Sequence, residues 1–216
     1  MENRVRVNGK LASVGQEVAA GDIVLADGRP VKLQEKEIYL AVNKPRGVVV
    51  TTDTSHHDRL IGDLIHIPER VFAVGRLDKE SEGLILMTNN GELSNQIQKA
   101  REFHEKEYLV TIDKPVTSEL LAGLSGGVWL RELNRQTRPC KVQKTGLHEL
   151  DITLTEGMNR QIRRMCEVYG CKVQRLRRIR IMNILLGDMK PGTCRELTEE
   201  EITQLKKLLS AGHTKT

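Results

Sequence analysis

Cysteines, long apolar runs and a secretion signal are scarce or absent in this sequence. Four cysteines in 216 residues are too few for a secreted domain held by disulfides, so we expect reduced thiols and a cytoplasmic protein. Cys166 and Cys171 lack a second pair of ligands at zinc spacing, which argues against structural zinc. No run of about 18 apolar residues predicts a membrane helix, and no basic-then-apolar pattern predicts a signal peptide.

Aromatic residues are also rare, at 3% of the chain, which argues against an extended platform for stacked bases. Positive charge, by contrast, is concentrated in one region. Residues 131–180 contain 10 Arg and 3 Lys against 5 acidic residues, a net charge of +8 in a chain whose total is +5. Such a segment is either a solvated polar face or the surface for an anionic partner. The predominance of arginine, whose planar fork suits phosphate, favours a nucleic acid bound mainly through its phosphates.

Short strand and helix patterns interleave along the chain. Residues 1–34 indicate short strands joined by glycine turns, and residues 35–216 indicate a larger unit. Most connections are too short for βαβ crossovers, which favours an α+β fold with a mixed, largely antiparallel sheet core and flanking helices. The strands of the larger unit are expected within 38–52 (two, around a turn at 44–47), 70–75, 84–88, 105–112, 140–144, 148–154 and 172–186.

Four helices are predicted from apolar spacing and capping residues. The first follows Asn90, the second is capped by Thr117, the third covers residues 160–169 and stops at Gly170, and the fourth begins with a capping box. The apolar spacing of the first helix is set by Leu93, Ile97 and Ala100. The third helix is expected to have an apolar face of Ile162, Met165, Cys166 and Tyr169 and a polar face of Arg160, Arg163, Arg164 and Glu167. The fourth helix is expected to have the capping pair Thr198 and Glu201 and the apolar stripe Ile202, Leu205, Leu208 and Leu209.

Three segments combine turn residues with charge beside apolar strands or helices. They are residues 43–45, residues 75–78 and residues 156–165. Each of them, taken singly, is typical of a charged surface loop. Together with the tyrosine of "EKEYLV", the three segments are a more specific indication of a functional site than any one of them alone.

The stretches "LAVNKPRGVVVTT", "VGRLDKESEGLILMTNNGEL", "HEKEYLVTIDKP" and "GMNRQIRRMCEVYG" resemble, in this order, the motifs of pseudouridine synthases. The resemblance covers about residues 38–205 and is strongest for the RsuA/RluB/RluE/RluF branch, and within it for the RluF group. It implies the pseudouridine synthase fold and a monomeric isomerase that needs no metal or cofactor. Such an enzyme detaches uracil from ribose C1′ of a uridine in RNA and rejoins it through C5. Large-subunit (23S) ribosomal RNA is the expected substrate, and a tRNA anticodon loop is the second candidate.

The resemblance also assigns roles to three residues. It implies that Asp78 is the nucleophile, that Arg163 is its ion-pair partner, and that Tyr108 covers the uracil or helps to remove the C5 proton. An aspartate with a pKa of about 3.9 is ionised at neutral pH, but a closed RNA pocket raises that value and a nearby cation lowers it. Arginine suits such a buried pair because it stays charged. Whether Asp78 adds to C1′ or acts through a glycal stays open.

RNA contacts are expected around this centre. The target uridine must leave its stack, which costs a few kcal/mol and least for an unpaired nucleotide, so a loop or bulge is the expected substrate. Ile162 is expected to pack beneath the pocket, and two further residues are expected to support the loop of Asp78 or to touch phosphate, namely Asn43 and Lys44. The full set of RNA-binding candidates is Arg76, Asn43, Lys44, Asn159, Arg160, Gln161, Arg164, Arg178 and Arg180.

The N-terminal segment, residues 1–34, resembles only the sheet portion of an S4 RNA-binding domain. The helix pair that usually precedes this sheet is not found ahead of Met1, so either it belongs to a longer chain or the protein lacks it. Two other functions stay open. An N-glycosidase would need a second carboxylate, with Glu80, Glu82 and Glu156 as candidates, and a non-catalytic S4-type RNA-binding protein would need none.

Overall fold

The computed structural model describes residues 4–19, 21–31, 36–51, 53, 58–98 and 103–212. The chain divides into two compact units, Met1–Glu37 and Ile38–Thr216. The predicted boundary between residues 34 and 35 lies outside the described residues, as does Ala100.

The first unit contains a small antiparallel sheet in the order β2-β1-β3-β4. The two-residue turns Asn8-Gly9 and Asp27-Gly28 both have positive φ at each position, which is the conformation of tight hairpins whose twist matches that of their strands. These turns account for the strands that the glycine spacing predicts. The strands are β1 (Val5–Val7), β2 (Lys10–Leu11), β3 (Val24–Ala26) and β4 (Arg29–Pro30).

The second unit is built on a nine-stranded sheet in the order β11-β12-β8-β13-β7-β5-β15, with β14 paired to β13 and β6 to β7. Among the described strands of this sheet, β13 and β7 pair in parallel and the other pairs are antiparallel. The predicted α+β fold with a mixed, largely antiparallel sheet is thus confirmed. The strands are β5 (Tyr39–Lys44), β6 (Phe72–Val74), β7 (Glu82–Thr88), β8 (Lys106–Ile112), β11 (Lys141–Lys144), β12 (Glu149–Leu154), β13 (Val173–Ile181), β14 (Ile184–Leu185) and β15 (Cys194–Glu196).

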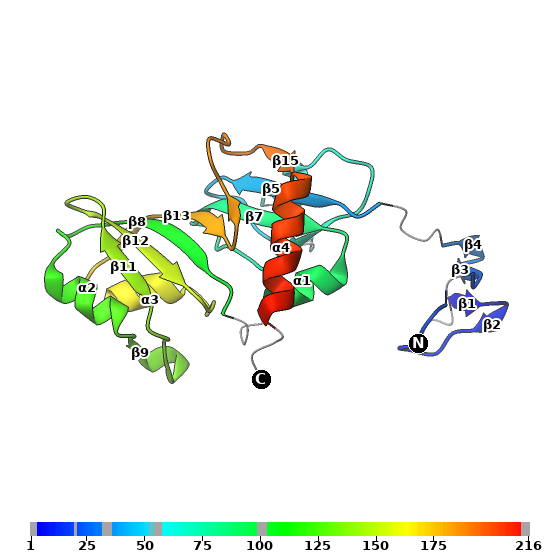
Figure 1. Ribbon diagram of the computed structural model, residues 1–216, viewed down its shortest axis with the longest axis horizontal. Coiled ribbons are helices and arrows are strands. Elements are labelled where there is room, and N and C mark those ends of the chain that lie inside the picture. The colour runs from blue at the N-terminus through cyan, green and yellow to red at the C-terminus, as the bar shows by residue number, and fades with distance from the viewer. Residues whose placement is uncertain are drawn as a thin grey trace. The chain divides into compact units, whose positions relative to one another are not determined.

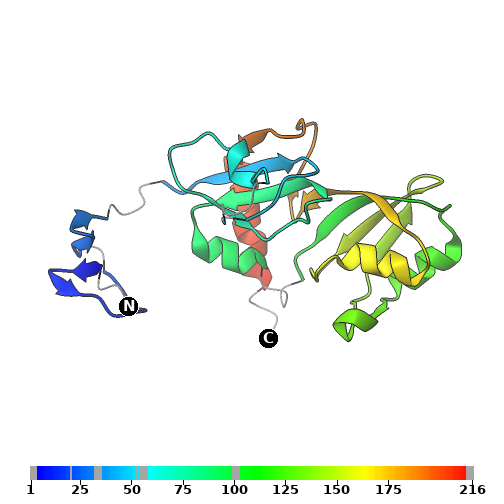
Figure 2. The ribbon, with the colours of Figure 1, turned by 180° about the vertical axis from the view of Figure 1, so that it is seen from behind.

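Helices cover this sheet in two groups (Figures 1 and 2). The pair α2 (Ser118–Ser125) and α3 (Gln161–Val168) packs on the half formed by β11, β12 and β8, while α1 (Gly91–Gln98) and α4 (Glu199–Gly212) pack beside β7 and β5. None of the described helices is both long and apolar enough to cross a membrane. Shorter elements complete the unit: the 3-10 helices η1 (Ile61–Leu64) and η3 (Arg131–Leu133), and the two-stranded ribbon of β9 (Trp129–Leu130) and β10 (Arg135–Gln136).

The central strands β5 and β7 are buried on both faces. Ala41 and Leu84 face the core with α1 and α4, whereas Val42 and Ile85 face the core that continues to α2 and α3. Burial on both sides explains why these strands appear in the sequence as continuous apolar runs without alternation.

Gly83 allows the parallel strands β7 and β13 to meet. A Cβ atom at this position would lie 2.3 Å from the backbone oxygen of Arg178, and its φ is +104°. Only glycine fits both conditions. The glycine in "ESEGLIL" is therefore required by the sheet that carries the site.

The helix boundaries follow the predicted caps. The Thr117 hydroxyl accepts from Leu120 N at 3.2 Å, and Thr198 and Glu201 form the reciprocal capping box at 3.1 and 2.9 Å. These caps are confirmed. Leu208, however, is exposed, so the buried stripe of α4 is narrower than predicted.

Two strand predictions are wrong in part. Residues 47–51 form no strand, because Val49 instead exchanges hydrogen bonds with Arg59 and Ile61 of a neighbouring loop. The predicted strand over 172–186 is interrupted, since Met182 adopts a φ of +51° and turns β14 back onto β13.

Candidate active site

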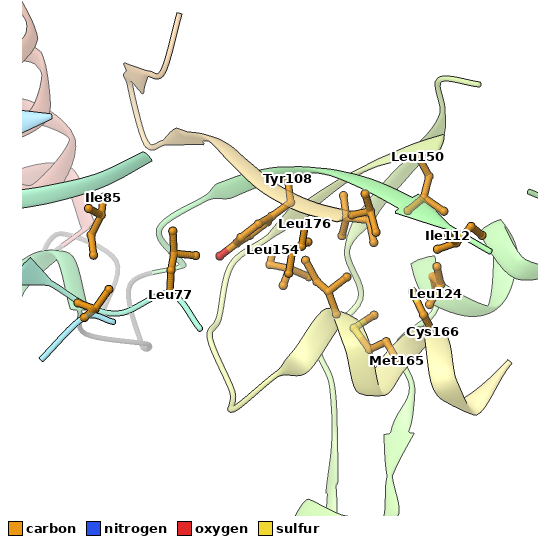
Figure 3. Close-up of a cluster of buried hydrophobic side chains, with 14 of the residues drawn as sticks. Leu77, Ile85, Tyr108, Ile112, Leu124, Leu150, Leu154, Met165, Cys166 and Leu176 are labelled. Carbon is orange, nitrogen blue, oxygen red and sulfur yellow. The ribbon is translucent and has the colours of Figure 1, made fainter. Parts of the chain in front are cut away.

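A groove of about 540 Å³ opens on the second unit, a size typical of small-ligand sites at about 300–1,000 Å³. The loop between β6 and β7 supplies Asp78 to its lining, β8 supplies Tyr108, the start of α3 supplies Arg160 and Ile162, and β13 supplies Arg178. Two of the three charged segments, 75–78 and 156–165, therefore meet at one surface with the stretch that carries Tyr108. Figure 3 shows the Tyr108 ring extending from β8 with its hydroxyl toward Leu77, the residue before Asp78.

Asp78 lies on a tight turn whose backbone is held from two sides. Leu77 is buried in the core and Asp78 is half-buried in the groove. Ser81 N donates to the Asp78 carbonyl at 3.0 Å, and Gly47 N donates to the Lys79 carbonyl at 2.8 Å. The turn is thus fixed through its backbone, which leaves the Asp78 carboxylate available to a ligand.

Lys44 supports this loop from inside the protein, while Asn43 beside it binds a neighbouring segment. Lys44 is fully buried, and its Nζ atom donates to the carbonyls of Pro45, Val48 and Lys79 at 3.1, 2.8 and 3.4 Å. Asn43 is also buried and donates to Met189 O at 2.7 Å. Of the two predicted roles, contact with the Asp78 loop is seen for Lys44 and not for Asn43, and phosphate contact is wrong because neither side chain reaches the surface.

Burial lowers the pKa of Lys44 to about 8, although the charge of Asp78 raises it. We expect Lys44→Met to lower the free energy of unfolding by about 2 kcal/mol, since buried carbonyls lose their donor. An unfolded lysine keeps its proton up to a pKa of about 10.4, so between pH 8 and 10 the unfolded state binds more protons and wild-type stability rises with pH. The difference between wild type and variant should therefore be larger at pH 10 than at pH 7. Urea denaturation at both pH values checks this, and an equal or smaller gap at pH 10 contradicts it.

Arg163 is buried on α3 and binds the far side of the same turn. Its Nη1 atom donates to Val173 O at 3.0 Å, and its Nη2 atom donates to Glu80 O at 3.3 Å. Burial and the charge of Arg160 lower the pKa of Arg163, while the charge of Asp78 raises it. The Nε atom is buried without a hydrogen-bond partner.

The predicted ion pair between Asp78 and Arg163 is not formed in the described part of the chain, where no ion pair within 4.0 Å joins them. The Nη atoms instead donate to the carbonyls of Val173 and Glu80, so the guanidinium holds the turn and does not contact the carboxylate. The prediction that Arg163 shares the polar face of its helix is wrong for the same reason.

Tyr108 and Arg178 are neighbours on the groove face of the sheet. They are direct partners in the β8–β13 register, and the Arg178 guanidinium lies 6.0 Å from the centre of the Tyr108 ring. Ile162 packs beneath the groove, as predicted.

Five of the RNA-binding candidates line the groove, namely Arg76, Asn159, Arg160, Gln161 and Arg178. The amide of Gln161, however, is buried and bonded to Glu156 at 2.9 Å, so its predicted RNA contact is wrong. Arg164 pairs with Glu132 away from the groove. Arg180 binds Glu105 and Glu107, which neutralise its charge, so it also fails as a phosphate ligand.

The sequence interpretation missed Lys106, which lines the groove two residues before Tyr108 on β8. The period of two along a strand could have identified it, because residues i and i+2 face the same side.

None of the three candidate second carboxylates is free beside Asp78. Glu80 pairs with Arg46 at 2.6 Å and Glu82 with Arg175 at 2.5 Å. Glu156 lines the groove, but its Oε1 atom accepts from Arg138 N and from Gln161 Nε2. The groove therefore presents one carboxylate, that of Asp78, without an ion-pair partner among the described residues, together with several arginines.

Comparison with known proteins gives the family. The sequence pattern of the RNA pseudouridylate synthase family matches residues 38–168, and the chain belongs to this family. It is accordingly an enzyme that isomerises uridine to pseudouridine in RNA. The family prediction from the motifs is confirmed, and nothing in these comparisons supports the N-glycosidase or the non-catalytic alternative.

Individual relatives with similar sequences or structures are also pseudouridine synthases. The dual-specificity RNA pseudouridine synthase RluF of Salmonella typhi is 45% identical over 210 residues, covering 96% of this chain and 72% of that protein. The ribosomal large subunit pseudouridine synthase B of Bacillus subtilis is 32% identical and covers 98% of this chain and 88% of its own length. A crystal structure of a pseudouridylate synthase matches with a TM-score of 0.77 at 29% identity, covering 94% of this chain and 89% of that one.

Proposed function

We propose that the groove receives one extruded uridine of a structured RNA and that Asp78 is the nucleophile in its isomerisation. Tyr108 covers the uracil, and Arg163 fixes the turn that carries Asp78. Arg76, Asn159 and Arg160 bind the RNA backbone at the rim. The observation that carries this proposal is a half-buried carboxylate without an ion-pair partner among the described residues, facing a groove whose other charged side chains are mostly basic.

The same groove favours an unpaired target nucleotide. The carboxylate lies in the groove beside Tyr108, and a base within a helix cannot enter such a pocket without leaving its stack. The substrate is large-subunit ribosomal RNA, with a tRNA loop as the second substrate. The names of the relatives support this choice, since one is a large-subunit ribosomal enzyme and others act with dual specificity.

The test uses the purified chain with transcripts of 23S ribosomal RNA and of tRNA. We expect one new stop of reverse transcription after carbodiimide treatment, without a change in RNA mass. Release of free uracil would support an N-glycosidase, and RNA binding without either change would support a binding protein. A stop in tRNA alone would reject the ribosomal substrate while keeping the reaction.

The four cysteines are free thiols, which supports a reducing compartment and a cytoplasmic location. The N-terminal sheet is proposed to act as an S4-like RNA-binding segment, because Arg6 and Lys10 are exposed on it. The monomeric state stays a prediction.

A further inference from the structure

Two cations, half-buried Lys106 and buried Arg178, lie in the groove. Lys106 on β8 and Arg178 on β13 both line it. In the register of the sheet, Arg178 is opposite Tyr108, and Lys106 is one side-chain position further along the same face of β8. Both side chains therefore flank the tyrosine that covers the base.

Neither cation has an acidic partner in the described part of the chain. Lys106 Nζ donates to His104 O at 3.2 Å, which leaves two of its three protons unused. Arg178 is 3% exposed and donates through Nε to Leu84 O at 2.7 Å, while its Nη2 atom is buried without a partner. Burying a charge without an opposite charge beside it is costly. Negative charge on a bound substrate would therefore stabilise this pair.

The titration of Lys106 agrees with that geometry. Burial and the neighbouring charge of Arg178 lower its pKa to about 8. The ammonium form still predominates at neutral pH, and its unused protons remain available as hydrogen-bond donors. The other charged or titratable groups lining this groove are Arg76, Asp78, Lys79, Tyr108, Glu156 and Arg160.

We propose that Lys106, assisted by Arg178, stabilises the negative charge that develops on the uracil ring when it leaves ribose C1′. This inference rests on the proposed role of Asp78. The C1′–N1 bond breaks and its electron pair passes into the uracil ring, whether the Asp78 carboxylate adds to C1′ or removes the C2′ proton. The anion then attacks C1′ through C5, which either breaks the Asp78–C1′ ester bond or, on the glycal, is accompanied by return of the proton from Asp78 to C2′. The base is then neutral with a proton on C5, and transfer of that proton from C5 to N1 completes pseudouridine.

The uracil ring fits this pair better than an RNA phosphate does. The cations lie beside the tyrosine ring, deep enough for Arg178 to be almost fully buried, whereas Arg76 and Arg160 are exposed where a backbone would pass. Charge stabilisation inside a site that excludes water is also worth more than the same contact at the rim.

The test compares Lys106→Met, Lys106→Arg and a control, Lys141→Met, whose lysine is exposed and paired with Glu105. Removing one donor to a developing anion lowers rates by about 10²–10³-fold. We therefore expect Lys106→Met to lower the single-turnover rate at saturating RNA about a hundredfold, with Kd changed less than twofold. Lys106→Arg should recover most of the rate, and the control should match wild type. The unchanged Kd reports that the variant is folded.

A second experiment distinguishes a contact of Lys106 with the uracil base from a contact with the RNA backbone. The phosphates on either side of the target uridine are replaced one at a time by uncharged methylphosphonates. If Lys106 holds a phosphate, Lys106→Met weakens binding to normal RNA but not to one of these substrates, which overturns the proposal. A normal saturated rate for Lys106→Met, or equal losses in both Lys106 variants, also overturns it. Wild-type activity in the same assay tests the proposed function separately.

Discussion

Asp78→Asn is expected to abolish pseudouridine formation, with a loss of at least about 10⁴-fold in the single-turnover rate. The amide has the same shape as the carboxylate but is neutral, so it is neither a nucleophile nor a base. Since the turn is held through the Asp78 and Lys79 carbonyls and not through the carboxylate, the fold should be unaffected. RNA affinity should stay within a few fold. Carbodiimide mapping at saturating RNA, with filter binding for Kd, measures both quantities.

The matched control is Asp58→Asn. The Asp58 carboxylate pairs with Lys79, the residue next to Asp78, at 2.6 Å. This pair is exposed, and such pairs contribute little to stability, so its loss should leave the rate close to wild type. Full activity of Asp78→Asn would mean that another group performs the reaction. Equal losses in both variants would mean that the charge of the loop matters and not the nucleophile.

The sequence predicts the local structure around this site better than its electrostatics. The strand, turn and strand around Asp78, the buried Tyr108 and the caps of α2 and α4 all follow from local patterns that the structure confirms. These features depend on residues close in sequence, where periodicity and turn preferences operate.

Features that depend on distant segments could not be predicted in the same way. Lys44 and Arg163 look like surface charges in the sequence, yet both are buried. Lys44 donates to the carbonyls of Val48 and Lys79, and Arg163 donates to those of Val173 and Glu80. A lysine or arginine is rarely buried without such partners, and the partners are identified only by the tertiary fold. The requirement for Gly83 likewise depends on β13, almost 100 residues further along the chain.

These contacts give the site its particular form of organisation. Lys44 Nζ and Gly47 N bind the Lys79 carbonyl from one side, and Arg163 binds Glu80 O from the other. Neither cation pairs with Asp78 in the described part of the chain; burial lowers the pKa of both, and the charge of Asp78 opposes this shift. The turn is therefore held through its backbone beside two buried cations, and these bonds leave the Asp78 carboxylate oxygens unused. Preorganisation of this kind reduces the entropy that must be lost when the substrate is positioned.

Arg163→Lys should test whether the guanidinium acts by positioning. Lysine keeps the charge but has no planar fork, so it cannot hold Val173 O and Glu80 O together. We expect the saturated rate to fall about 10²-fold, since small displacements of a reacting group have this effect, and the melting temperature to fall with it.

The neighbouring Arg164→Lys is the matched control for the saturated rate, because Arg164 pairs with Glu132 and donates to Asn159, and neither group belongs to the turn of Asp78. It alters the same side chain on the same helix without touching the turn, and we expect a rate close to that of wild type. Single-turnover kinetics and thermal unfolding of both variants measure the contrast. If Arg163→Lys keeps the full rate, the fork is dispensable and charge alone suffices. If it loses stability but not rate, Arg163 supports the fold and does not position Asp78.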